Sequence, residues 1–316
     1  MPTEGLAAPA TTEPHLRLLA PVELAKLASL ALRARTIVEG ALAGAHRNPH
    51  PGTSLEFTEH REYAPGDDVR RIDWKAVART DRYAIKRFED ETEMRVLLML
   101  DTSASMGYRR TGVAKLDYAT YLAAALAYLV GQQRDAAGLL AFDEQIRAQL
   151  LPSTRAGQVR EVLAALEGLR PAAAAKPGLA FDAAAEMCDK RSLIVLFSDL
   201  LDAEDGATGE TATGPWAERV RQLRSRGHDV VLFHLLDPDE VDLPFEDLRF
   251  FTGVEPGDER RLLADARDLA SAFREESAMF RQRWQNLGLE AKVEYRFART
   301  DAPPAEILHP FLVGRA

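Results

Sequence analysis

Two short polar stretches stand directly after apolar runs, and they carry the residues best suited to chemistry. Asp101-Thr102-Ser103-Ala104-Ser105 follows the run 96–100, and Asp199 follows Ser198 after the run 193–197. The carboxylates of Asp101 and Asp199 and the hydroxyls of Ser103 and Ser105 form a hard, all-oxygen donor set that suits Mg²⁺ or Mn²⁺. An Asp followed by Ser or Thr is also a common turn or helix cap. The matched places of the two carboxylates after apolar runs favour a site over that structural interpretation.

The apolar runs are the elements that must position these residues. Four continuous runs are typical of strands covered on both faces, and they span 96–100, 136–142, 193–197 and 230–236. Helical patterns alternate with these runs over 116–132, 158–169, 178–188 and 216–226. This alternation predicts an α/β fold with a doubly wound, mostly parallel sheet and helices on both faces. Because ligands bind beyond the carboxyl ends of such strands, we expect Asp101 and Asp199 to face one crevice.

The remaining patterns frame this core. Alternating apolar and polar residues at 146–150 and 293–297 predict edge strands with one wet face. Residues 16–45 and 262–287 have helical patterns, the second long and amphipathic. We therefore expect a disordered tail over 1–14, an N-terminal helical and charged extension over 15–92, and the α/β domain over 93–316.

Residues 56–93 are unusually rich in charge, with 11 acidic and 8 basic side chains. A solvated surface segment with weak ion pairs is one interpretation. Trp74 among arginines and a tyrosine favours the other, because Arg, Trp and Tyr are the residues that anchor protein interfaces. The predicted partner-binding residues are Arg61, Tyr63, Asp67, Arg70, Arg71, Asp73, Trp74, Lys75 and Arg79.

Two of these stretches resemble known families. Asp101-Thr-Ser103-Ala-Ser105-Met-Gly107 resembles the metal-ion-dependent adhesion site of von Willebrand factor A-type domains, and Leu196-Phe-Ser198-Asp199 resembles the place of their second aspartate. The block from Glu56 to Arg79 is similar to the bacterial domain-of-unknown-function family number 58, whose members carry it ahead of a von Willebrand A-like domain.

The resemblance implies a fold, a metal site and a partner. The fold would be a Rossmann-like sheet, and the partner a MoxR-type AAA+ ATPase. Asp101, Ser103, Ser105 and Asp199 would surround Mg²⁺ or Mn²⁺ directly or through water, with one position open to an acidic residue of the partner.

One element of that pattern is missing. The family places a threonine in the loop before the helix that opens near Gly178, but residues 172–175 are all alanine. A water molecule can replace the lost oxygen, which keeps the metal as one hypothesis. In the other, the ammonium of Lys176 points into the crevice and stands in for the ion.

Composition excludes several classes of function. The 316 residues carry 40 basic and 49 acidic side chains, a formal net charge of −9, which disfavours nucleic acid as a partner. Cys188 is the only cysteine, so no disulfide forms within the chain. The longest apolar run, 121–130, is too short to insert into a membrane, and residues 1–14 lack the features of a secretory signal. We expect a cytoplasmic protein.

Enzymatic signatures are few. The sequence contains no Walker loop, no Gly-x-Ser-x-Gly elbow and no His-Glu-x-x-His motif, and His234 is expected to pack in the core. We therefore expect a non-enzymatic protein-interaction module. The alternative is a metal-dependent phosphoester hydrolase that uses Asp101 and Asp199, although the general base or third carboxylate that such chemistry needs is not evident.

Overall fold

The computed structural model describes residues 19–45, 60–62, 84–86, 94–110, 112–201, 214–254 and 256–313. Contacts divide the chain into two units, Met1–Arg47 with Met94–Arg315, and Asn48–Glu93 with Ala316. The first unit holds the sheet, and we call it the sheet unit.

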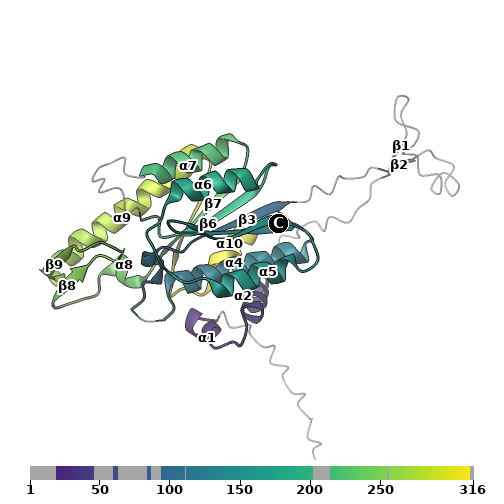
Figure 1. Ribbon diagram of the computed structural model, residues 1–316. Helices are drawn as coiled ribbons and strands as arrows, with labels where there is room; N and C mark the ends of the chain where they lie inside the picture. The colour runs from purple at the N-terminus through teal and green to yellow at the C-terminus, as the bar shows by residue number, and fades with distance from the viewer. Residues whose placement is uncertain are drawn as a thin grey trace, which may run out of the picture. The chain divides into compact units, whose positions relative to one another are not determined.

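A six-stranded sheet forms the centre of the sheet unit (Figure 1). Its strands, in spatial order, are β10 (Glu294–Arg299), β7 (Asp229–Leu236), β6 (Leu193–Ser198), β3 (Arg95–Asp101), β4 (Ala136–Phe142) and β5 (Ile146–Ser153). All neighbours are parallel except β4 and β5, which are antiparallel. This is the doubly wound order, whose direction of winding reverses between β3 and β6. The predicted α/β class and both predicted edge strands are confirmed.

Helices cover both faces of the sheet because the central strands are apolar on both sides. Along β3, Leu98 and Leu100 enter one core layer, and Leu97 and Met99 enter the other. The first layer packs against α2 (Leu30–Ala45), α4 (Lys115–Gln132), α5 (Gln158–Gly168) and α10 (Pro304–Val313). The second packs against α6 (Pro177–Met187), α7 (Gly214–Ser225) and α9 (Ala266–Ala291). His234 is buried, as predicted, and donates to or accepts from the Tyr295 hydroxyl at 2.8 Å.

Two predicted helices differ from the structure. Within 16–45 the described residues form two helices, α1 (Pro21–Ala25) and α2, and α2 packs against α4 of the sheet unit. The helix predicted over 262–287 begins too early, because its first residues belong to the strand β9 (Arg261–Asp265). This strand pairs with β8 (Leu248–Thr252) in an antiparallel hairpin. The helix α9 begins only at Ala266, where the carboxylate of Asp265 accepts the backbone N–H of Arg267 at 3.0 Å. Two short helices, η2 (Ala104–Gly107) and α8 (Pro238–Asp242), complete the sheet unit.

The second unit contains a short antiparallel pair, β1 (His60–Glu62) and β2 (Ala84–Lys86), in which Arg61 pairs with Ile85. Arg61 is the one predicted partner-binding residue with described backbone. The others, between Tyr63 and Arg79, lie outside the described residues, as does the predicted tail over 1–14. Among the helices that the structure describes, none is both long and apolar enough to span a membrane.

Candidate functional site

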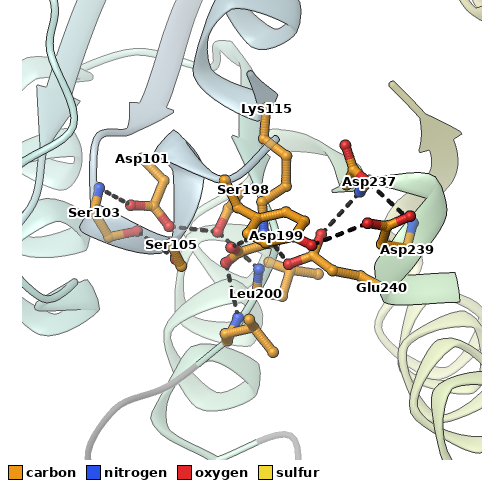
Figure 2. A network of polar contacts seen from close by, with 12 residues as sticks. Asp101, Ser103, Ser105, Lys115, Ser198, Asp199, Leu200, Asp237, Asp239 and Glu240 are labelled. Atoms are coloured by element: carbon orange, nitrogen blue, oxygen red, sulfur yellow. Dashed lines mark hydrogen bonds and ion pairs between the residues drawn. The ribbon is translucent and has the colours of Figure 1, made fainter. Parts of the chain in front are cut away.

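The reversal between β3 and β6 brings the two predicted carboxylates together. Asp101 ends β3, Asp199 follows β6, and both side chains are fully buried. The hydroxyl of Ser198 donates to Asp101 Oδ2 at 2.6 Å, and the backbone N–H of Ser103 donates to Asp101 Oδ1 at 2.8 Å (Figure 2). The crevice that we expected at the strand ends is therefore a network of polar groups. We call this network the strand-end cluster, and its members are Asp101, Ser103, Ser105, Lys115, Ser198, Asp199 and Glu240.

The predicted serines join the same cluster. The hydroxyl oxygens of Ser103 and Ser105 lie 3.1 Å apart. The hydroxyl of Thr102 donates instead to the backbone carbonyl of Phe142 in β4, at 3.0 Å. It therefore holds the loop to the sheet.

The loop with the missing threonine lies directly against this turn. Ala104 N donates to Ala173 O, and Ala172 N donates to Thr102 O, each at 3.0 Å. The methyl groups of residues 172–175 offer no oxygen to the cluster. The hypothesis that Lys176 fills the gap is wrong, because its side chain is exposed at the start of α6.

A different lysine enters the cluster. Lys115, the first residue of α4, is fully buried, and its Nζ lies 2.7 Å from Asp199 Oδ2 and 2.6 Å from Glu240 Oε1 (Figure 2). Sequence reasoning missed it because the predicted helix began one residue later. The sequence did carry a signal for it. A helix that follows a strand begins at the carboxyl edge of the sheet, so a lysine at the start of a helix that is apolar on all sides is expected near the strand ends.

Glu240 was missed as well, although the sequence carries a signal for it. Asp237, at the end of β7, begins an Asp-Pro-Asp-Glu stretch typical of a capping box. The structure has that box: Asp237 Oδ1 accepts from Asp239 N at 3.0 Å, and Glu240 Oε2 accepts from Asp237 N at 2.8 Å. The other carboxylate oxygen of Glu240 is thereby aimed at Lys115.

The buried charged groups of the cluster shift one another's pKa values. Burial and then the neighbouring charge of Asp199 raise the pKa of Asp101 to about 7. Burial likewise raises the pKa of Glu240, although Lys115 opposes the shift. Burial alone would lower the pKa of Lys115, but Asp199 and Glu240 outweigh it, so the pKa lies above its usual value. The cluster therefore holds a permanent ammonium among three carboxyl groups.

Comparisons with known proteins place the chain in a family. The model of the family described as "Protein of unknown function DUF58" matches residues 59–283. The chain belongs to the DUF58 family. Uncharacterized protein Rv1480 of Mycobacterium tuberculosis (strain ATCC 25618 / H37Rv) is 30% identical over 246 residues, which cover 75% of this chain and 74% of that protein.

Solved structures resemble this DUF58 chain in fold. The conserved hypothetical protein BatB from Bacteroides thetaiotaomicron has a TM-score of 0.44 at 16% identity, over 71% of this chain and all of that one. The SpRpn10 VWA domain has a TM-score of 0.40 at 11% identity, over 68% of this chain and 93% of that one.

The donors of the DUF58 chain do not fit a divalent ion as they are arranged. Mg²⁺ requires about six oxygens at close to octahedral positions. The ammonium of Lys115 already lies against Asp199, and residues 172–175 supply no hydroxyl. Among the described residues, no group of three or more His, Cys, Asp or Glu side chains is placed to hold a metal ion. Binding of Mg²⁺ or Mn²⁺ by Asp101, Ser103, Ser105 and Asp199 stays a prediction.

A surface of arginine and aromatic side chains leads outward from the cluster. Asp239, beside Glu240, accepts from the Tyr108 hydroxyl at 3.1 Å and from Arg110 Nη1 at 3.2 Å. The guanidinium carbon of Arg110 lies 5.2 Å from the ring centre of Phe245. The guanidinium carbon of Arg249, a residue of β8, lies 4.0 Å from the same ring centre. These contacts connect the strand-end cluster to the β8–β9 hairpin.

The hairpin itself is apolar and exposed. Four of its large side chains are more than half exposed: Leu248 at 63%, Phe250 at 58%, Leu262 at 56% and Leu263 at 51%. Three Asp–Arg pairs at the hairpin and its ends join residues two apart in the chain, and they are Asp247–Arg249, Asp258–Arg260 and Asp265–Arg267. The described charges around the hairpin therefore largely cancel, and its apolar side chains remain available for contact.

Proposed function

We propose that this chain is a non-enzymatic protein-binding module of the cytoplasm, whose partner is a MoxR-type AAA+ ATPase. The observation that carries the proposal is the exposed hairpin β8–β9, which is connected to the rim of the strand-end cluster, formed by Tyr108, Arg110 and Asp239. Exposed apolar patches rimmed by polar groups mark protein-interaction sites in soluble proteins. The ATPase as partner follows from the sequence resemblance alone.

The composition of this surface suits a protein partner. Phe250 and Leu263 face each other across the hairpin, and Arg261 lies with its guanidinium carbon 4.8 Å from the ring centre of Phe250. Aromatic and arginine side chains are the residues that most often carry binding energy at interfaces. The paired charges give the hairpin no basic field that would favour phosphate.

The strand-end cluster supports binding over hydrolysis. The alternative hydrolase would need Asp101 and Asp199 to hold a metal ion beside a phosphate ester. In the structure Asp199 is ion-paired to Lys115, and both oxygens of Asp101 accept hydrogen bonds. The charged segment with Arg70, Arg71 and Trp74 is proposed as a second contact of the same partner.

The test is the affinity of the full chain for a MoxR-type ATPase from the same organism, measured by calorimetry. The variant Phe250→Ser with Leu263→Ser should weaken binding at least tenfold, because two anchors of about 1–2 kcal/mol each are removed. The matched control is Leu289→Ser, since Leu289 is 77% exposed near the far end of α9.

Equal affinities of the hairpin variant and the control would contradict the proposal, as would the absence of any binding. Hydrolysis of a generic phosphoester with Mn²⁺, lost in Asp101→Ala, would instead support the hydrolase.

A further inference from the structure

The position of Lys115 in the fold is unfavourable for a positive charge. It is the first residue of an 18-residue helix, where the positive end of the helix dipole disfavours a cation. Its side chain is also fully buried, although lysine is almost never buried unless it is paired. The burial is therefore explained by pairing, whereas the unfavourable place at the start of the helix indicates that another requirement decides this position.

That requirement is the charge of the strand-end cluster. Asp199 and Glu240 come from different elements, the end of β6 and the helix α8, and the ammonium lies within 2.7 Å of an oxygen of each. Removing one partner of a buried pair leaves an uncompensated charge, which is strongly destabilising. The cluster therefore needs a cation at this point to be stable when folded.

We propose that Lys115 is the built-in cation of the strand-end cluster and that its ammonium occupies the Asp199 carboxylate, which is one of the four predicted metal ligands, in place of a divalent ion. Two separate features agree with it: the loop at 172–175 contributes only methyl groups, and the ammonium already contacts the second carboxylate. The cluster then needs no loading with metal and offers no open coordination position to a partner carboxylate. Glu240, whose side chain is 23% exposed, is then the group through which the cluster contacts a partner.

The inference deepens the proposed function, because it concerns the cluster beside the proposed binding surface, but it can be tested without a partner. The experiment is thermal unfolding of the full chain in chelator and in excess Mn²⁺, for wild type, Lys115→Ser, Lys115→Ser with Asp101→Ala, and Lys176→Ser. The last is the matched control, since Lys176 is a nearby but exposed lysine.

Wild type and Lys176→Ser should show no shift on adding Mn²⁺. Lys115→Ser should be less stable in chelator and gain roughly 5–10 °C at about a hundred times the dissociation constant, a gain that Asp101→Ala removes. If Lys115→Ser does not fold, Lys115→Ser with Glu240→Gln is used in its place, because it removes one charge of each sign and still leaves space beside Asp199.

A shift in wild type that Asp101→Ala abolishes would overturn the inference, because the ion would then bind beside the lysine. No shift in any folded variant would overturn it as well, since the emptied position would not be a cation site. Neither result bears on the ATPase, so the proposed function is judged separately by its own affinity measurement.

Discussion

Asp101 and Lys115 both lie where their charged forms are costly. Each is fully buried, and each is held by particular contacts rather than by solvent. Lys115 is held by two carboxylates, whereas Asp101 accepts hydrogen bonds from Ser198 and Ser103 and faces the like charge of Asp199. The ammonium is therefore compensated, and the carboxylate of Asp101 is the group whose ionisation the fold disfavours.

This difference predicts a pH dependence of stability. The pKa of Asp101 is about 7 in the folded chain and about 3.9 in an unfolded one. Because the folded chain keeps the proton to higher pH, the contribution of Asp101 is most favourable below about pH 4 and is lost as the pH rises to about 7. Denaturant unfolding in chelator should show the stability of wild type falling relative to Asp101→Asn over this range, then levelling off.

Asp143→Asn is the matched control for that measurement. Asp143 is equally buried at the end of the neighbouring strand β4, but it is paired with Arg147 at 2.6 Å. A difference between wild type and Asp101→Asn that is flat from pH 4 to 8 would contradict the shifted pKa.

At the scale of elements, the edge strand β5 depends on a glycine of its neighbour. A Cβ atom added at Gly138 in β4 would lie 2.7 Å from the backbone nitrogen of Pro152 and 2.8 Å from the carbonyl oxygen of Leu150. Gly138→Ala should therefore displace β5 and destabilise the chain by about 1–3 kcal/mol in urea unfolding. Gly168→Ala is the control, since its added Cβ meets nothing within 4 Å, and equal stability of the two variants would refute the account.

The helices and strands around the site could be predicted from the sequence wherever one hydrophobic pattern is unambiguous. Each central strand is a continuous apolar run bounded by an aspartate or by turn residues, so its type and its end follow from the sequence, and with them the meeting of Asp101 and Asp199. The hairpin was not predictable in this way. Arg261-Leu-Leu-Ala-Asp265 is too short to separate the period of a strand from that of a helix, and it runs directly into α9.

The partners of the carboxylates were harder to predict than the carboxylates. That Lys115 rather than Lys176 supplies the ammonium depends on where the first turn of α4 lies relative to β6, which is a tertiary relation. Likewise, Glu240 follows from its capping box only as a local contact, and its bond to Lys115 requires α8 to lie beside the start of α4.

At the scale of the whole molecule, exposed apolar side chains are unevenly distributed. Six large apolar residues are more than half exposed in the part of the chain that the structure describes, and four of them lie on the β8–β9 hairpin. The other two, Leu151 and Leu289, lie on separate elements of the sheet unit. In Figure 1 the hairpin adjoins the start of α9 near α8, beyond the carboxyl ends of the strands. The sheet unit thus presents its apolar surface beside the strand-end cluster.

Hydrogen–deuterium exchange of the full chain, alone and with the MoxR-type ATPase, tests most directly whether this surface binds the partner. We predict slower exchange on binding over residues 248–265 and over the rim at 107–110, with no change at the amino ends of the strands, at 189–192 and 226–228. Protection confined to those amino ends, or no protection anywhere in the sheet unit, would contradict the account.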